Sequence, residues 1–207
     1  MDSVTLWTTI VDGAFIMIPL AVMLIVVIIV FIVKCVVLKR ASKLDPSFMN
    51  RIRDHVLEGD LESAAQLCRH QSSPYSRLIL KGVTRIGRPL ADIRLAIENA
   101  GNMEAASLSK GLPWLYTIAA SAPLLGLLGT VIGMVDAFHT MAQNGSATYI
   151  GQLSSGIYQA LVTTIVGLGV GILALFAYNI LVSSLNRIIT LMEARTEEFI
   201  DFLNEPS

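Results

Sequence analysis

Two threonines and one carboxylate are the polar residues whose positions in this chain could handle a proton. Thr130 and Thr164 each lie inside a long apolar block. A hydroxyl can donate a hydrogen bond to an ionised carboxylate or accept one from a protonated acid. Asp136, close to His139, lies near the end of its block, where a charge costs much less than at the centre of a bilayer. We therefore interpret Asp136 as a hydrated, interfacial group and the threonines as candidate proton-handling groups.

Small residues surround both threonines at steps of three or four, which places each set on one face of a helix. Gly129 and Gly133 also form a GxxxG pair. Close helix packing is the ordinary explanation, because small residues let backbones approach in lipid. The alternative is that the small residues form a smooth face that contacts a partner. Thr163 and Asp136 are weaker candidates for the proton pathway, Asp136 as a proton relay. The first set is Ala119, Pro123, Gly126, Thr130, Gly133 and Ala137, and the second is Gly156, Ala160, Thr164, Gly167, Gly171 and Ala174.

Three helices that cross a membrane must hold these residues. The chain has 207 residues, of which 54% are hydrophobic and 15% charged, a composition unlike that of a soluble domain. Residues 13–33, 111–135 and 140–186 contain no Asp, Glu, Lys, Arg or His. Since about 20 apolar residues span the hydrocarbon, we predict an all-α polytopic membrane protein with three transmembrane helices. They are expected at 14–38, 112–137 and 157–185.

The basic residues predict the orientation of these helices. All 15 Lys and Arg residues lie between residues 34 and 110 or after residue 186. Basic residues near the ends of spans stay in the cytoplasm. We therefore expect a periplasmic tail (1–13), a cytoplasmic helical segment (39–111), a periplasmic loop (138–156) and a cytoplasmic tail (186–207). Because residues 1–12 contain no Lys or Arg, we expect a retained first span and not a cleaved signal peptide.

The segment between the first two spans contains several helix start and stop signals. Gly59 can end one helix and Asp60 can cap the next. Pro74 follows two serines and opens a third helix, and Pro89 opens a fourth. Pro113 lies where this fourth helix would enter the second span, so we expect one long helix that bends there. No strand pattern occurs.

Motifs for catalysis or metal binding are absent from the sequence. It has no phosphate-binding loop, no HExxH and no CxxC. Cys35 and Cys68 are interpreted as small apolar residues, and His55 and His70 as surface histidines. We therefore expect no enzyme activity, cofactor, metal or nucleic-acid partner.

Two long stretches closely resemble the signature motifs of the ExbB/TolQ/MotA proton-channel family. They are Ala122-Pro-Leu-Leu-Gly-Leu-Leu-Gly-Thr-Val-Ile-Gly-Met134 and Gly156-Ile-Tyr-Gln-Ala-Leu-Val-Thr-Thr-Ile-Val-Gly-Leu168, the latter followed by Ala177-Tyr-Asn179. The order of the spans resembles the ExbB and TolQ branch. MotA-type flagellar stators usually carry a fourth span, which this sequence lacks.

The resemblance implies a homopentamer in the bacterial inner membrane, with the second and third spans around a pore. A single-span ExbD-like or TolR-like partner would bring an essential aspartate, and a TonB-like or TolA-like protein would transmit the motion. Thr130 and Thr164 match the family's pore threonines. Gln159 is the third residue expected on the pore and proton pathway, where it replaces a glutamate of well-studied members. The expected packing or pore-lining residues are Gly126, Gly129, Gly133, Ala160, Gly167 and Gly171.

The function expected from the resemblance is therefore an ExbB-like motor subunit that energises TonB-dependent outer-membrane transport. A TolQ-like envelope-maintenance motor is the alternative within the same class. A passive oligomeric scaffold, whose small residues only pack helices, is the rival from another class. A small-solute transporter is disfavoured because the sequence has no internal inverted repeat.

Overall fold

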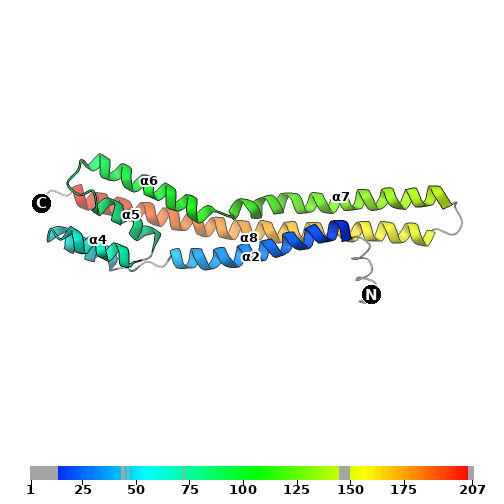
Figure 1. Ribbon diagram of the computed structural model, residues 1–207, viewed down its shortest axis with the longest axis horizontal. Helices are drawn as coiled ribbons and strands as arrows, with labels where there is room; N and C mark the ends of the chain where they lie inside the picture. Colours follow the sequence, from blue (N-terminus) through cyan, green and yellow to red (C-terminus); the bar gives the residue numbers. More distant parts are fainter. Residues whose placement is uncertain (1–13, 43–44, 46, 72, 145–149, 205–207) are drawn as a thin grey trace. The chain divides into compact units, whose positions relative to one another are not determined.

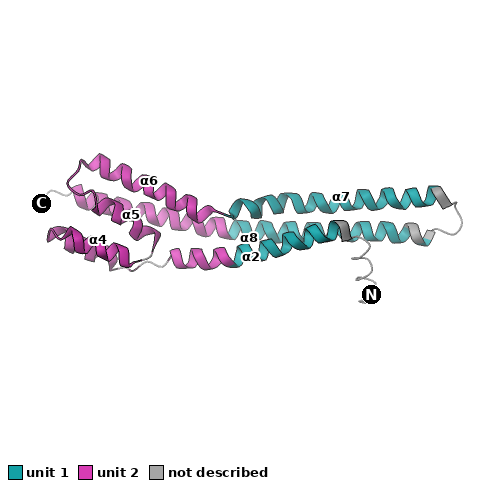
Figure 2. Ribbon diagram, in the orientation of Figure 1, with its two compact units in different colours: residues 1–32, 111–180 teal, residues 33–110, 181–207 magenta. Residues whose placement is uncertain are grey.

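The computed structural model describes residues 14–42, 45, 47–71, 73–144 and 150–204 (Figure 1). These residues form α-helices and no β-strand, which confirms the predicted all-α class. The chain divides into two compact units (Figure 2). Unit 1 comprises residues 1–32 and 111–180, and unit 2 comprises residues 33–110 and 181–207.

Three helices are long and apolar enough to cross a membrane, which confirms the predicted number of spans. They are α2 (Ala14–Ala41), α7 (Leu112–Asn144) and α8 (Ile150–Asn204). With 55 residues, α8 is about 80 Å long, far more than the hydrocarbon thickness of a bilayer. Its apolar part, up to residue 180, belongs to unit 1. Residues 186–204, expected as a tail, continue the helix.

Unit 1 exposes large apolar side chains along its helices. Leu124 on α7 is 65% exposed and Ile165 on α8 is 68% exposed. Water around such long apolar faces would be unfavourable, whereas lipid or other membrane helices match them. The faces of α7 and α8 that pack on each other carry small residues instead.

Unit 2 has a conventional apolar core. Short helices α3 (Phe48–Leu57), α4 (Leu61–His70) and α5 (Pro74–Val83) precede the longer α6 (Leu90–Ser109). The core residues Phe48, Ile52, Ile79, Ile97 and Phe199 are each fully buried. Because Phe199 belongs to α8, the last part of that helix completes this core.

The helix ends in unit 2 follow the local signals of the sequence. Gly59 has φ of 76°, a left-handed conformation that glycine adopts without strain after a helix. Asp60 caps α4, since its carboxylate accepts a hydrogen bond of 3.0 Å from the Ser63 N–H. The predicted roles of both residues are therefore confirmed.

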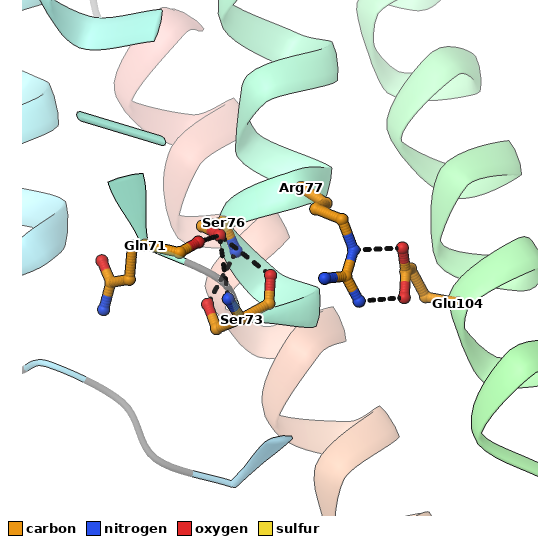
Figure 3. A network of polar contacts seen from close by, with 5 residues as sticks. All are labelled: Gln71, Ser73, Ser76, Arg77 and Glu104. Atoms are coloured by element: carbon orange, nitrogen blue, oxygen red, sulfur yellow. Dashed lines mark hydrogen bonds and ion pairs between the residues drawn. The ribbon is translucent and has the colours of Figure 1, made fainter. Parts of the chain in front are cut away.

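A polar network fixes the start of α5 and joins it to α6 (Figure 3). The backbone N–H of Ser76 donates to the hydroxyl of Ser73, and the N–H of Ser73 donates back to the hydroxyl of Ser76. The next residue, Arg77, donates two hydrogen bonds to Glu104, at 2.5 and 2.6 Å. This planar two-point contact fixes the orientation of both side chains.

The single bent helix expected around Pro113 is wrong. Helix α6 ends at Ser109 and α7 begins at Leu112. Gly111 has φ of 86°, which interrupts the helix, and Pro113 then lies in the first turn of α7, where its missing N–H is tolerated. The last carbonyl groups of a helix have no hydrogen-bond donor within the helix. At the end of α6, the side chain of Lys34 donates a hydrogen bond of 3.0 Å to one of them, the carbonyl of Leu108.

Candidate functional site

Helices α7 and α8 approach closely along their small-residue faces within unit 1 (Figure 1). A Cβ atom added to Gly126 would lie 3.0 Å from the Cα of Thr164 and 3.2 Å from the Cα of Gly167. A Cβ atom on Gly167 would lie 2.7 Å from the carbonyl oxygen of Ala122. These neighbours are backbone atoms, which cannot move away as a flexible side chain can. The two helices are therefore so close that only glycine fits at residues 126 and 167.

The same contact continues toward both ends of the two helices. A Cβ on Gly133 would lie 2.9 Å from the Cβ of Ala160, and a Cβ on Gly171 would lie 2.6 Å from the ring of Pro123. The two stripes thus pack on each other within one chain. This arrangement corresponds to the ordinary explanation of the spacing, close packing of helices in lipid.

Thr164 forms a hydrogen bond between the two helices. Its hydroxyl donates to the backbone carbonyl of Gly126 at 2.8 Å. The absence of a side chain on Gly126 lets the α8 backbone come close enough for this bond. The sequence identified Thr164 but gave no sign of its partner, because the acceptor is a main-chain atom.

Thr130 on α7 and Thr163 on α8 carry two more hydroxyls, and both residues are buried. The hydroxyl of Thr130 donates to the carbonyl of Leu127 at 2.6 Å, and that of Thr163 donates to the carbonyl of Ala160 at 2.7 Å. Thr163 lies directly against Gly129. The helical spacing of residues 160, 163 and 167 agrees with the naming of Thr163 as a weaker candidate from the sequence.

The three hydroxyls share one chemical property. Each donates its hydrogen to a backbone carbonyl, so each oxygen keeps lone pairs that can accept a hydrogen bond. In this arrangement, the threonine oxygens can accept a hydrogen bond from a protonated carboxylic acid. Donation to an ionised carboxylate would require a hydroxyl to leave its carbonyl.

The remaining predicted residues lie at other positions of α7 and α8. Asp136 and His139 are exposed on α7, between Thr130 and Asn144. Gln159 on α8 is half-buried, one residue before Ala160.

The residues that the structure describes bring no group of three or more His, Cys, Asp or Glu close enough to hold a metal ion. Cys68 is buried on α4, and this burial raises the pKa of its thiol to about 12. The neutral thiol therefore prevails at physiological pH, as the interpretation of Cys68 as a small apolar residue requires.

Comparison with known proteins identifies the family. Residues 70–194, which contain both stripes and all three threonines, match the MotA/TolQ/ExbB proton channel family. The chain belongs to this family. With three helices that can span a membrane, this member of the proton channel family is a multi-pass membrane protein.

Relatives of this proton channel family member carry ExbB or TolQ names. The chain is 37% identical to the putative biopolymer transport protein ExbB-like 1 of Synechocystis sp., over 60% of this chain and 50% of that protein. It is 31% identical to a putative ExbB homolog of Methanothermobacter thermautotrophicus, over 69% and 50%. It is 39% identical to the Tol-Pal system protein TolQ of Haemophilus influenzae, over 45% and 40%. The chain thus spans about half the length of these curated relatives.

Proposed function

We propose that this chain is an ExbB-like subunit of a proton-driven motor in the bacterial inner membrane, which works with an ExbD-like partner to energise TonB-dependent outer-membrane transport. The observation that carries the proposal is the hydrogen bond of Thr164 to Gly126 across two membrane helices that also carry the buried hydroxyls of Thr130 and Thr163. Membership of the proton channel family supports it.

The titrating group of the motor must come from another chain. Residues 111–135 and 140–186 contain no Asp, Glu, Lys, Arg or His. A threonine hydroxyl does not ionise near neutral pH, but it can hold a neutral or an ionised acid by hydrogen bonds. A partner helix with one carboxylic acid at this depth would supply the missing proton carrier.

The hydrogen bonds of the threonines suggest how the two states of that acid differ. The protonated acid donates to a threonine oxygen while the bond from Thr164 to Gly126 stays intact. The ionised acid needs a donor, so a hydroxyl must leave its carbonyl. Losing one hydrogen bond within a membrane costs roughly 0.6 to 1.7 kcal/mol. A proton that crosses about 150 mV releases roughly 3.5 kcal/mol, enough to drive this exchange.

Assembly and orientation complete the proposal. The exposed apolar side chains of Leu124 and Ile165 leave surface for neighbouring copies, and a homopentamer is the assembly proposed here. The confinement of all Lys and Arg to residues 34–110 and 187–195 supports an N-terminus outside and unit 2 in the cytoplasm. A TonB-like energy transducer would receive the work.

A TolQ-like envelope-maintenance motor is the second candidate, favoured by the 39% identity to a TolQ protein. Complementation separates the two candidates. Restored iron-siderophore uptake in a strain without ExbB supports the first, and restored detergent resistance in a strain without TolQ supports the second.

Proton flux into vesicles tests the motor against the passive scaffold. The chain is reconstituted with and without its single-span partner, and a pH-sensitive dye inside the vesicles reports proton entry. We expect flux only with the partner, and a loss of most of it in Thr130→Val and Thr164→Val variants that still bind the partner. Equal flux in wild type and both valine variants would contradict the proposed pathway.

A further inference from the structure

Unit 2 contains a cavity that the proposed proton pathway does not use. Its volume is about 310 Å³, and its walls come from α5, α6 and the last part of α8. Sites for small molecules start at roughly 300 Å³. The cavity is therefore large enough for one small ligand.

The deep part of the cavity wall is apolar with one exception. Leu78, Ile97 and Met192 line it, and each is almost completely buried. Thr196, which is 8% exposed, lines the cavity beside them. Its hydroxyl is buried and has no hydrogen-bond partner in the described part of the chain.

An unpartnered buried hydroxyl costs free energy, roughly 1 to 3 kcal/mol. The side chain of threonine in a helix adopts either of two staggered rotamers about the Cα–Cβ bond, and its hydroxyl points in a different direction in each. Rotation about the Cα–Cβ bond of Thr196 can therefore turn the hydroxyl toward a polar atom in the cavity. A ligand that supplies such an atom would remove the cost.

The outer part of the wall is acidic. Glu98 on α6 and Glu193 on α8 are exposed and line the same cavity, with Asn102 beside them. Arg94 interacts electrostatically with Glu98, but its guanidinium is hydrogen-bonded to Glu197, at 3.0 and 3.1 Å. Neither Glu98 nor Glu193 forms an ion pair with a residue that the structure describes.

We propose that this cavity binds a small organic ammonium ion with an apolar body and one polar substituent. The apolar body would pack on Leu78, Ile97 and Met192, and the ammonium group would lie at the mouth near Glu98 and Glu193. The polar substituent would meet the hydroxyl of Thr196. The arrangement selects cations over neutral molecules through the two carboxylates, and apolar amines over inorganic cations through the apolar wall.

Calorimetry on the purified 207-residue chain in a non-ionic detergent tests the proposal with matched compounds. Phenethylamine carries the ammonium and an apolar body, phenethyl alcohol removes the charge, and tyramine adds a hydroxyl. We expect phenethylamine to bind about tenfold more tightly than the alcohol, because two carboxylates face its charge. Tyramine should bind more tightly than phenethylamine by several-fold, through one additional hydrogen bond.

Three variants locate the site. The double variant Glu98→Gln with Glu193→Gln should remove the preference for the ammonium, whereas Glu62→Gln, which removes one negative charge on α4 outside the cavity, should keep it. Thr196→Val should abolish the advantage of tyramine and leave phenethylamine unchanged. Equal binding of amine and alcohol, no binding of either, or an unchanged preference in the double variant would overturn the proposal.

Discussion

The hydroxyl of Thr164 on α8 donates a hydrogen bond of 2.8 Å to the backbone carbonyl of Gly126 on α7. The bond depends on a glycine, since a Cβ atom at residue 126 would lie 3.0 Å from the Cα of Thr164. A residue proposed to handle protons is therefore also part of the contact between two membrane helices.

Replacing Thr164 separates these two roles. Thr164→Val keeps the shape of the side chain but removes the hydroxyl, so we expect a loss of stability of only about 0.6 kcal/mol, typical of a hydrogen bond in a membrane. Partner-dependent proton flux should fall at least about tenfold if the hydroxyl binds the partner's acid. Thr164→Ser restores a hydroxyl and should recover flux. Valine and serine variants with equal flux would argue against a role for this hydroxyl.

Two glycines of α8 form a matched pair for testing helix packing. A Cβ on Gly167 would lie 2.7 Å from the carbonyl oxygen of Ala122. A Cβ on Gly169 would have no neighbouring atom within 4 Å among the residues that the structure describes. We expect Gly167→Ala to destabilise the protein by about 1 to 3 kcal/mol and to lower its melting temperature in detergent. Gly169→Ala should be neutral or stabilising by up to about 1 kcal/mol. Equal melting temperatures of the two variants would refute the described contact.

Single cysteines test the proposed orientation. Ala142→Cys at the exposed end of α7 and Thr84→Cys after α5 are introduced separately into a chain in which Cys35 and Cys68 are alanine. In spheroplasts, a membrane-impermeant maleimide should label the cysteine at residue 142 directly. The cysteine at residue 84 should react only after permeabilisation, because the basic residues around it are retained in the cytoplasm. Labelling of both from one side would refute the orientation.

The buried thiol of Cys68 gives a prediction about pH. Burial raises its pKa to about 12, so in a Cys35→Ala background it should react with maleimide more than about a hundredfold slower than a free thiol at pH 8. The unfolded chain should react at the normal rate. Because the folded pKa is the higher one, the contribution of the neutral thiol to stability is complete below pH about 8.5 and is lost as the pH rises toward 12. Fast labelling of the folded protein would contradict the buried position.

Local features were predictable because their causes lie within a few residues. The helix stop at Gly59 and the cap at Asp60 depend on glycine's left-handed conformation and on one carboxylate near a helix start. Pro113 shows the limit of such local signals. A proline marks either a bend or a helix start, and the conformation of Gly111 decided between them.

The sequence by itself determined the three apolar spans, the all-α class, the family and the small-residue face of each membrane helix. The family follows from the resemblance of two signature stretches, and the other properties follow from composition and from the 3.6-residue repeat, which need no knowledge of neighbouring elements. Only the tertiary structure decided that the two small-residue faces meet within one chain, and that Thr164 bonds to a main-chain carbonyl. It also brought Glu98, Glu193 and Thr196 to one cavity. Helical spacing fixes which residues share a face, but packing chooses what that face contacts, and packing depends on side chains far apart in the sequence.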